Sequence, residues 1–153
     1  HYDRLCLVST RPYAGVPAAL AALAGRVPLA LLTNKPERFA VRILEALGLA
    51  GHFRQVVGGD TLPQRKPDPA PLRHVAAALG APLERTLLVG DSRIDAETAA
   101  RAGAPFAHVR WGYGRDREAE ERGALLVIDR PELLADALSP LLAARPAGGG
   151  GSG

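Results

Sequence analysis

Residues 86–103 read TLLVGDSRIDAETAARAG, and this stretch contains the clearest strand-to-helix pattern of the sequence. The run TLLV predicts a buried strand, because it is apolar throughout rather than alternating between apolar and polar positions. Gly90, Asp91 and Asp95 follow, and the residues up to Gly103 predict a helix that ends at this glycine. Two carboxylates four residues apart at the end of a buried strand need an explanation, because like charges repel.

The alternation of strand and helix recurs on both sides of this stretch. Apolar runs predict five strands, at residues 27–33, 54–59, 86–91, 105–111 and 124–129. Intervening segments predict helices, at residues 34–48, 67–80, 94–103 and 130–142, with one more within residues 11–26. Strands joined by such helices imply right-handed crossovers and parallel pairing. The predicted class is therefore α/β, with a doubly wound and mostly parallel sheet.

Polar residues follow the predicted strands at the points where ligands bind such sheets, beyond the carboxyl ends. This rule selects Thr33 and Asn34, the loop of residues 60–66, Asp91, and residues 111–115. Thr33 and Asn34 offer a hydroxyl and backbone N–H groups that lead into a helix, which suits an anion. Ordinary helix capping is the alternative, since both residue types are common caps.

The two aspartates allow different interpretations. Asp91 ends a strand on a turn, where a carboxylate can coordinate a hard divalent cation such as Mg²⁺. Asp95 lies near a helix start, where the helix dipole favours a negative charge, so capping explains it as well as function does. For Asp91 a metal is favoured, because a cap does not require the preceding Gly90.

Lysine is rare in this chain. Only Lys35 and Lys66 occur among 19 basic residues, and Lys66 stands among prolines in QRKPDPAP. Pro67 keeps Lys66 out of the helical conformation. A compact ammonium charge suits a phosphate oxygen or a pair of carboxylates, whereas a lone loop lysine is usually just solvated.

The composition excludes several classes of function. A net charge of +3 with scattered basic residues gives no footprint for nucleic acid. No apolar run reaches the roughly 18 residues of a membrane span. Cys6 is the sole cysteine, which excludes an internal disulfide and fits a cytoplasmic protein. The sequence contains no methionine, so further residues are expected before His1.

Three segments together resemble a known family. LLTNKPERF, GGDTLPQRKPDPAPL and VGDSRIDAETAARAG look like motifs two, three and four of the haloacid dehalogenase superfamily, closest to its phosphoglycolate phosphatase subfamily. YAGV and WGYG also resemble that subfamily, and the likeness extends over about residues 13–142. The resemblance implies a Rossmann-like core, Mg²⁺, and hydrolysis of a small phosphorylated metabolite, most simply 2-phosphoglycolate, through an aspartyl-phosphate.

The resemblance also implies a role for each candidate residue. Thr33 and Asn34 would bind the transferring phosphoryl group, and Lys66 would neutralise it and steady the nucleophile. Asp91 would bind Mg²⁺. Asp95 would hold the catalytic residues in place without contacting the substrate itself. The two like charges are then tolerable, because a cation and Lys66 lie between or beside them.

The first motif of the superfamily has no counterpart here. It is a strand that ends in Asp-x-Asp and supplies the nucleophile, and no Asp-x-Asp occurs in the sequence. The central strand of the sheet is therefore expected to be absent, so that the strands ending at Thr33 and Val89 either flank a gap or pair with each other. Residues 1–12 are expected to be the end of a helical cap domain, residues 13–145 the core, and residues 146–153 a disordered glycine-rich tail.

Other functions stay open at this point. The scaffold also suits another phosphatase or a sugar-phosphate mutase, and a cap domain would distinguish them. A non-catalytic phosphate-binding or interaction domain is a further alternative. A receiver-type signalling domain is disfavoured, because its acidic residues lie near its start. Without an aspartate nucleophile, residues 1–153 alone are expected to be inactive.

Overall fold

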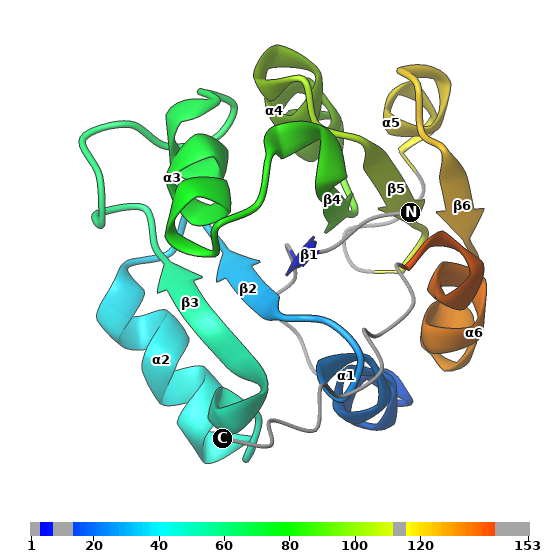
Figure 1. The fold of residues 1–153 in the computed structure, drawn as a ribbon, viewed down its shortest axis with the longest axis horizontal. Coiled ribbons are helices and arrows are strands. Elements are labelled where there is room, and N and C mark those ends of the chain that lie inside the picture. The colour runs from blue at the N-terminus through cyan, green and yellow to red at the C-terminus, as the bar shows by residue number, and fades with distance from the viewer. Residues whose placement is uncertain (1–3, 8–13, 112–115, 143–153) are drawn as a thin grey trace, which may run out of the picture.

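A six-stranded parallel sheet forms the centre of the structure, in the order β3-β2-β1-β4-β5-β6 (Figure 1). The computed structural model describes residues 4–7, 14–111 and 116–142. The strands are β1 (Arg4–Leu7), β2 (Leu29–Leu32), β3 (Phe53–Val57), β4 (Thr86–Gly90), β5 (Phe106–Val109) and β6 (Leu126–Ile128). All five strand pairs are parallel, so the predicted α/β class with its parallel sheet is confirmed.

Helices connect these strands. The α-helices are α1 (Val16–Ala24), α2 (Glu37–Ala46), α3 (Ala70–Ala78), α4 (Arg93–Ala102), α5 (Arg117–Glu121) and α6 (Leu134–Leu138). The 3₁₀ helices are η1 (Ala50–His52), η2 (Leu83–Arg85), η3 (Pro131–Leu133) and η4 (Ser139–Leu141). Among the described residues, no helix combines the length and the apolar character that crossing a membrane requires.

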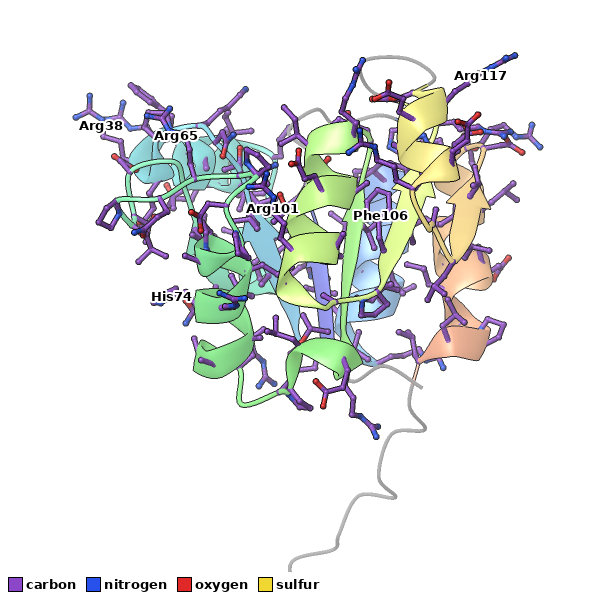
Figure 2. All side chains as sticks on the ribbon, turned by 90° about the horizontal axis from the view of Figure 1, so that it is seen from above. Arg38, Arg65, His74, Arg101, Phe106 and Arg117 are labelled. Carbon is purple, nitrogen blue, oxygen red and sulfur yellow. The ribbon has the colours of Figure 1, made fainter. Side chains whose placement is uncertain are left out.

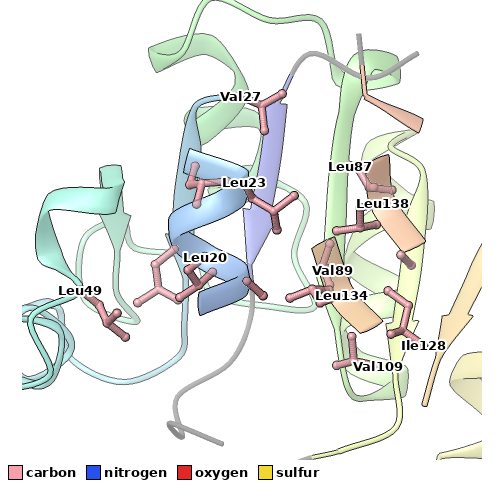
Figure 3. Close-up of a cluster of buried hydrophobic side chains, with 14 of the residues drawn as sticks. Leu20, Leu23, Val27, Leu49, Leu87, Val89, Val109, Ile128, Leu134 and Leu138 are labelled. Atoms are coloured by element: carbon pink, nitrogen blue, oxygen red, sulfur yellow. The ribbon is translucent and has the colours of Figure 1, made fainter. Parts of the chain in front are cut away.

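The sheet is covered on both faces, which explains why its strands are apolar throughout. Helices α1, α2 and α6 pack on one face, and α3, α4 and α5 pack on the other (Figure 1). Successive side chains of a strand point to opposite faces, so Leu87 and Val89 meet the first layer and Leu88 meets the second. Figure 3 shows the first layer, where Leu20 of α1 and Leu134 of α6 face the sheet.

Neither a gap nor direct pairing of β2 with β4 occurs in the middle of the sheet. β1 lies between β2 and β4 and pairs with both, so that Leu5 stands opposite Leu29 on one side and Leu87 on the other. The predictions of an absent central strand and of a helical end over residues 1–12 are therefore wrong for residues 4–7. An open gap would leave two rows of backbone N–H and C=O groups unpaired, and this short segment pairs with them.

β1 does not supply the chemistry of the absent motif. The sequence continues after Leu7 with Val8, Ser9 and Thr10, so no aspartate follows this strand as Asp-x-Asp would require. The strand position is filled, and the Asp-x-Asp pattern is still absent from this sequence.

The helices differ from the prediction in two places. The helix expected over residues 130–142 is broken into η3, α6 and η4, and α6 ends just before Pro140, which has no N–H to donate within a helix. Helix α5 is an additional element that the apolar pattern does not predict. The expected disordered tail, residues 146–153, lies outside the described residues.

Candidate active site

The loops after β2 and β3 approach each other closely at the carboxyl edge of the sheet. A Cβ on Gly58 would lie 2.3 Å from the backbone nitrogen of Glu37, and one on Gly59 would lie 2.2 Å from the carbonyl oxygen of Asn34. The Gly59 N–H donates to the carbonyl of Lys35 at 2.7 Å. Only glycine fits at these two positions, so the glycine pair of the sequence brings the two loops together.

Thr33 and Asn34 occupy the turn after β2, as predicted. Thr33 is buried, its N–H donates to the carbonyl of Val57 at 2.9 Å, and its Oγ1 accepts from the Lys35 N–H at 3.2 Å. The Asn34 Nδ2 donates to the carbonyl of Lys66 at 3.2 Å. Asn34 therefore ties this turn to the loop that carries Lys66.

Helix α2 is capped from a distance rather than by Asn34. The residue before the helix is Pro36, which makes no side-chain capping bond. Asp60 Oδ1, from the loop after β3, accepts from the Glu37 N–H at 2.8 Å instead. The capping alternative for Asn34 is therefore wrong, and the cap is a residue that the sequence analysis placed only in a loop.

Lys66 and Asp95 form a buried ion pair. The Lys66 Nζ donates to Asp95 Oδ1 at 2.9 Å, and the two side chains are 7% and 1% exposed. Such a pair persists in an apolar environment only when the charges also meet further hydrogen-bonding partners. Lys66 is thus not a solvated loop lysine, because its ammonium group is fixed by a carboxylate from α4.

The other oxygen of Asp95 binds the beginning of α4. Asp95 Oδ2 accepts from the Asp91 N–H at 3.1 Å, from the Ser92 N–H at 3.3 Å and from the Ser92 hydroxyl at 3.1 Å. Ser92 and Asp95 form a capping box. The capping interpretation of Asp95 is therefore confirmed for one oxygen, and the other oxygen binds Lys66, while a catalytic role for Asp95 stays a prediction.

Ser92 contributes to this arrangement and was not a candidate in the sequence analysis. Its hydroxyl is close to the Asp95 N–H, at 3.4 Å, as well as donating to the Asp95 carboxylate. The signal was present, because a serine followed three residues later by an acidic residue is typical of a helix start.

Gly90 makes room for the Asp95 carboxylate. A Cβ at this position would lie 2.5 Å from Asp95 Oδ2 and 2.6 Å from Asp95 Cβ. Real Cβ atoms do not approach so closely, and the carboxylate is held by four donors, so it cannot move away without losing them. The close packing of the Asp95 side chain therefore explains why residue 90, the last residue of β4, is a glycine.

Replacing Gly90 by alanine is expected to lower the free energy of unfolding by about 1–3 kcal/mol, because the added methyl group overpacks the site. Gly51→Ala is the matched control, since a Cβ there meets nothing within 4 Å. Urea denaturation of both variants measures the difference. Equal stability of the two variants would show that the Gly90 contact is not restrictive.

Asp91 lies directly after β4, at the same edge as Lys66, and is partly buried. Within residues 14–111 and 116–142, no group of three or more His, Cys, Asp or Glu side chains could hold a metal ion. One carboxylate does not satisfy the octahedral oxygen coordination of Mg²⁺. The described residues therefore do not fit a complete Mg²⁺ site, and Asp91 stays a predicted ligand. Of the segment 111–115, only Trp111 lies within the described residues.

The arrangement is suited to holding a phosphate group. Thr33, Asn34 and Lys66 bring a hydroxyl, an amide and an ammonium group to loops joined by hydrogen bonds, and Asp91 and Asp95 bring the carboxylates. The sequence model of the haloacid dehalogenase-like hydrolase matches residues 1–103, which include all five positions. The chain belongs to the haloacid dehalogenase-like hydrolase family.

A phosphoglycolate phosphatase from Rhodospirillum rubrum is similar to this chain within the family. It is 48% identical over 130 residues, which are 84% of this chain and 54% of that protein. The chain thus spans about half the length of the curated relatives it matches. The motif resemblance of the sequence analysis is confirmed at the level of the family.

Solved structures of haloacid dehalogenase-like proteins share the fold. A predicted phosphoglycolate phosphatase from Haemophilus somnus has a TM-score of 0.73 and 31% identity, covering 82% of this chain and 56% of that one. A protein of Thermotoga maritima with a provisional assignment as β-phosphoglucomutase has a TM-score of 0.76 and 30% identity, covering 85% and 61%. The Rossmann-like core is confirmed by this likeness.

Proposed function

We propose that this chain works as part of a Mg²⁺-dependent phosphatase that hydrolyses 2-phosphoglycolate through an aspartyl-phosphate. One observation carries the proposal: the buried Lys66–Asp95 pair lies beside the turns of Asn34 and Asp91 at one edge of the sheet. The choice of 2-phosphoglycolate as substrate rests on the likeness to the Rhodospirillum rubrum relative, which is a phosphoglycolate phosphatase.

Each residue has a proposed task in this reaction. The Thr33 hydroxyl and the Asn34 turn bind oxygens of the phosphoryl group, as donors at a strand end suit an anion. Lys66 neutralises its charge, and Asp95 positions Lys66 by accepting from Nζ at 2.9 Å. Asp91 is proposed as one Mg²⁺ ligand among several, the others coming from outside the described residues.

The nucleophile is proposed to lie outside residues 1–153, because this sequence contains no Asp-x-Asp. We therefore propose a functional protein about as long as the relatives, and refer to it as the full-length form. Its partner would be a small phosphorylated metabolite, and its location the cytoplasm, which fits a chain with the single cysteine Cys6.

A sugar-phosphate mutase is the second candidate, supported by the likeness to the Thermotoga maritima protein. Both reactions need the same phosphate-binding edge, so the substrate has to distinguish them. The full-length form is expected to release inorganic phosphate from 2-phosphoglycolate, and EDTA is expected to stop the release. Conversion of β-glucose 1-phosphate into glucose 6-phosphate without phosphate release would contradict the phosphatase and support the mutase.

A further inference from the structure

His108 on β5 is a buried polar side chain that the proposed phosphatase chemistry does not use. Its ring is 0% exposed, and neither ring nitrogen has a hydrogen-bond partner within the described residues. It lies on the sheet face that α4 and α5 cover, near Phe106, which Figure 2 labels. Buried polar groups are nearly always hydrogen-bonded, so an imidazole without a partner calls for a physical explanation.

A carboxylate stands between His108 and an arginine. The Nε2 of His108 is 3.8 Å from Glu120 Oε1 of α5, too far for a hydrogen bond. The same oxygen accepts from Arg110 Nε at 2.7 Å, and Glu120 Oε2 accepts from Arg110 Nη2 at 3.2 Å. Arg110 also donates to Asp129 at 2.5 Å. A small movement of Glu120 would therefore exchange one donor for another.

The charges around His108 act in both directions. Burial lowers the pKa of His108 below its ordinary value of 6.5, and Arg110, just after β5, lowers it further. Glu120 and Asp116 at α5 and Asp95 of α4 oppose this effect, because their negative charges favour the protonated ring. Burial prevails, so the ring is neutral at pH 7 and gains a proton only in more acidic solution.

We propose that His108 and Glu120 form an acid-operated switch between β5 and α5. A proton from solvent binds the neutral imidazole, so both ring nitrogens then carry hydrogen, and Nε2 donates to Glu120 Oε1. Glu120 moves toward the ring and weakens its bonds to Arg110. The switch thus replaces the Glu120–Arg110 ion pair at the carboxyl edge of β5 with a Glu120–His108 ion pair buried under α5. This exchange changes the contacts that fix α5 to the sheet.

The switch has a defined effect on stability. In the unfolded chain His108 has its ordinary pKa of 6.5, while its pKa in the folded chain is lower. The unfolded chain therefore binds more protons below pH 6.5. The stability that neutral His108 provides is fully present above pH 6.5. It is lost as the pH falls from 6.5 through the pKa of His108 in the folded chain.

NMR on the complete chain tests the switch directly. The ring signals of His108 are expected to titrate below pH 6.5, and the side-chain Nε–H signal of Arg110 is expected to shift with the same midpoint. In Glu120→Gln the His108 midpoint is expected to fall further, because the attracting carboxylate is gone. Titration at or above pH 6.5, or an Arg110 signal unchanged by it, would overturn the proposal.

Thermal unfolding provides a second test on the same chain. Between pH 7.5 and pH 5, the Tm of the wild type is expected to fall roughly 3–5 °C more than that of His108→Gln. His74→Gln is the matched control, since His74 lies exposed on α3, where Figure 2 labels it. His74→Gln is expected to behave as the wild type does. An equal fall in wild type and His108→Gln would overturn the proposal.

Discussion

Replacing Lys66 by methionine is expected to lower the free energy of unfolding by about 3–5 kcal/mol, because the buried Asp95 carboxylate loses its cation. Methionine keeps an unbranched chain of similar length, so the loss is electrostatic rather than one of packing. Asp95→Asn is expected to cost a similar amount, because it leaves the Lys66 ammonium group buried without a counter-charge. Guanidinium denaturation of residues 1–153 measures both losses.

The double variant Lys66→Met/Asp95→Asn separates the ion pair from the individual side chains. Its loss is expected to be smaller than the sum of the single losses by about 1–3 kcal/mol, because the second replacement removes no further charge pairing. Arg101→Met is the control, since it breaks the exposed pair with Glu97 and should change stability by less than about 1 kcal/mol. Strict additivity would mean that Lys66 and Asp95 are not coupled in solution.

Residues 1–153 alone are expected to leave 2-phosphoglycolate intact, with turnover at least about 10⁴-fold below that of the full-length form. A covalent route divides hydrolysis into two easier steps, and it requires an aspartate that meets phosphorus in line with the leaving oxygen. No Asp-x-Asp is present, and the residues after β1 are Val8, Ser9 and Thr10. Thr33 and Lys66 are proposed to bind the phosphate group, and binding alone does not break the ester bond. The measurement is phosphate release with protein in excess over substrate.

Much of the fold could be predicted, because its dominant signal is local. Fully apolar runs such as Leu29–Leu32 mark strands that are buried on both faces, and glycines such as Gly103 mark helix ends. Parallel topology places the carboxyl ends of the strands at one edge of the sheet. It therefore predicts that Asn34, Lys66 and Asp91 lie at the same edge, and no distance is needed for this prediction.

The missed elements are those that depend on tertiary contacts. Four residues of β1 carry too little pattern to be recognised, and they become a strand because β2 and β4 offer unpaired edges on both sides. Helix α5 has only five residues, and Asp116 holds its start by accepting from the Ala119 N–H and also binds the Arg93 N–H of α4. Those backbone donors lower the pKa of Asp116, although burial opposes them.

The candidate site, like the fold, has features that residue type predicts and features that depend on tertiary contacts. Residue type and loop position select Lys66 and Asp91 as candidates, because few side chains suit phosphate and Mg²⁺. The role of Gly90 became clear only from the position of the Asp95 carboxylate, 2.5 Å from where a Cβ would stand. His108 was not a candidate, since a histidine in an apolar strand gives no sign that its ring nitrogens will lack a hydrogen-bond partner among the residues the structure describes.

One assay tests the central claim, that this chain carries the phosphate-binding part of a phosphatase site and not its nucleophile. Phosphate release from 2-phosphoglycolate is compared for the full-length form, its Asp91→Asn variant and residues 1–153, at equal Mg²⁺ and with the Rhodospirillum rubrum enzyme as the positive control. We expect rapid release by the full-length form, a loss of roughly 10²–10³-fold in Asp91→Asn, and no release from residues 1–153. Comparable turnover by residues 1–153, or an Asp91→Asn variant as active as its parent, would contradict it.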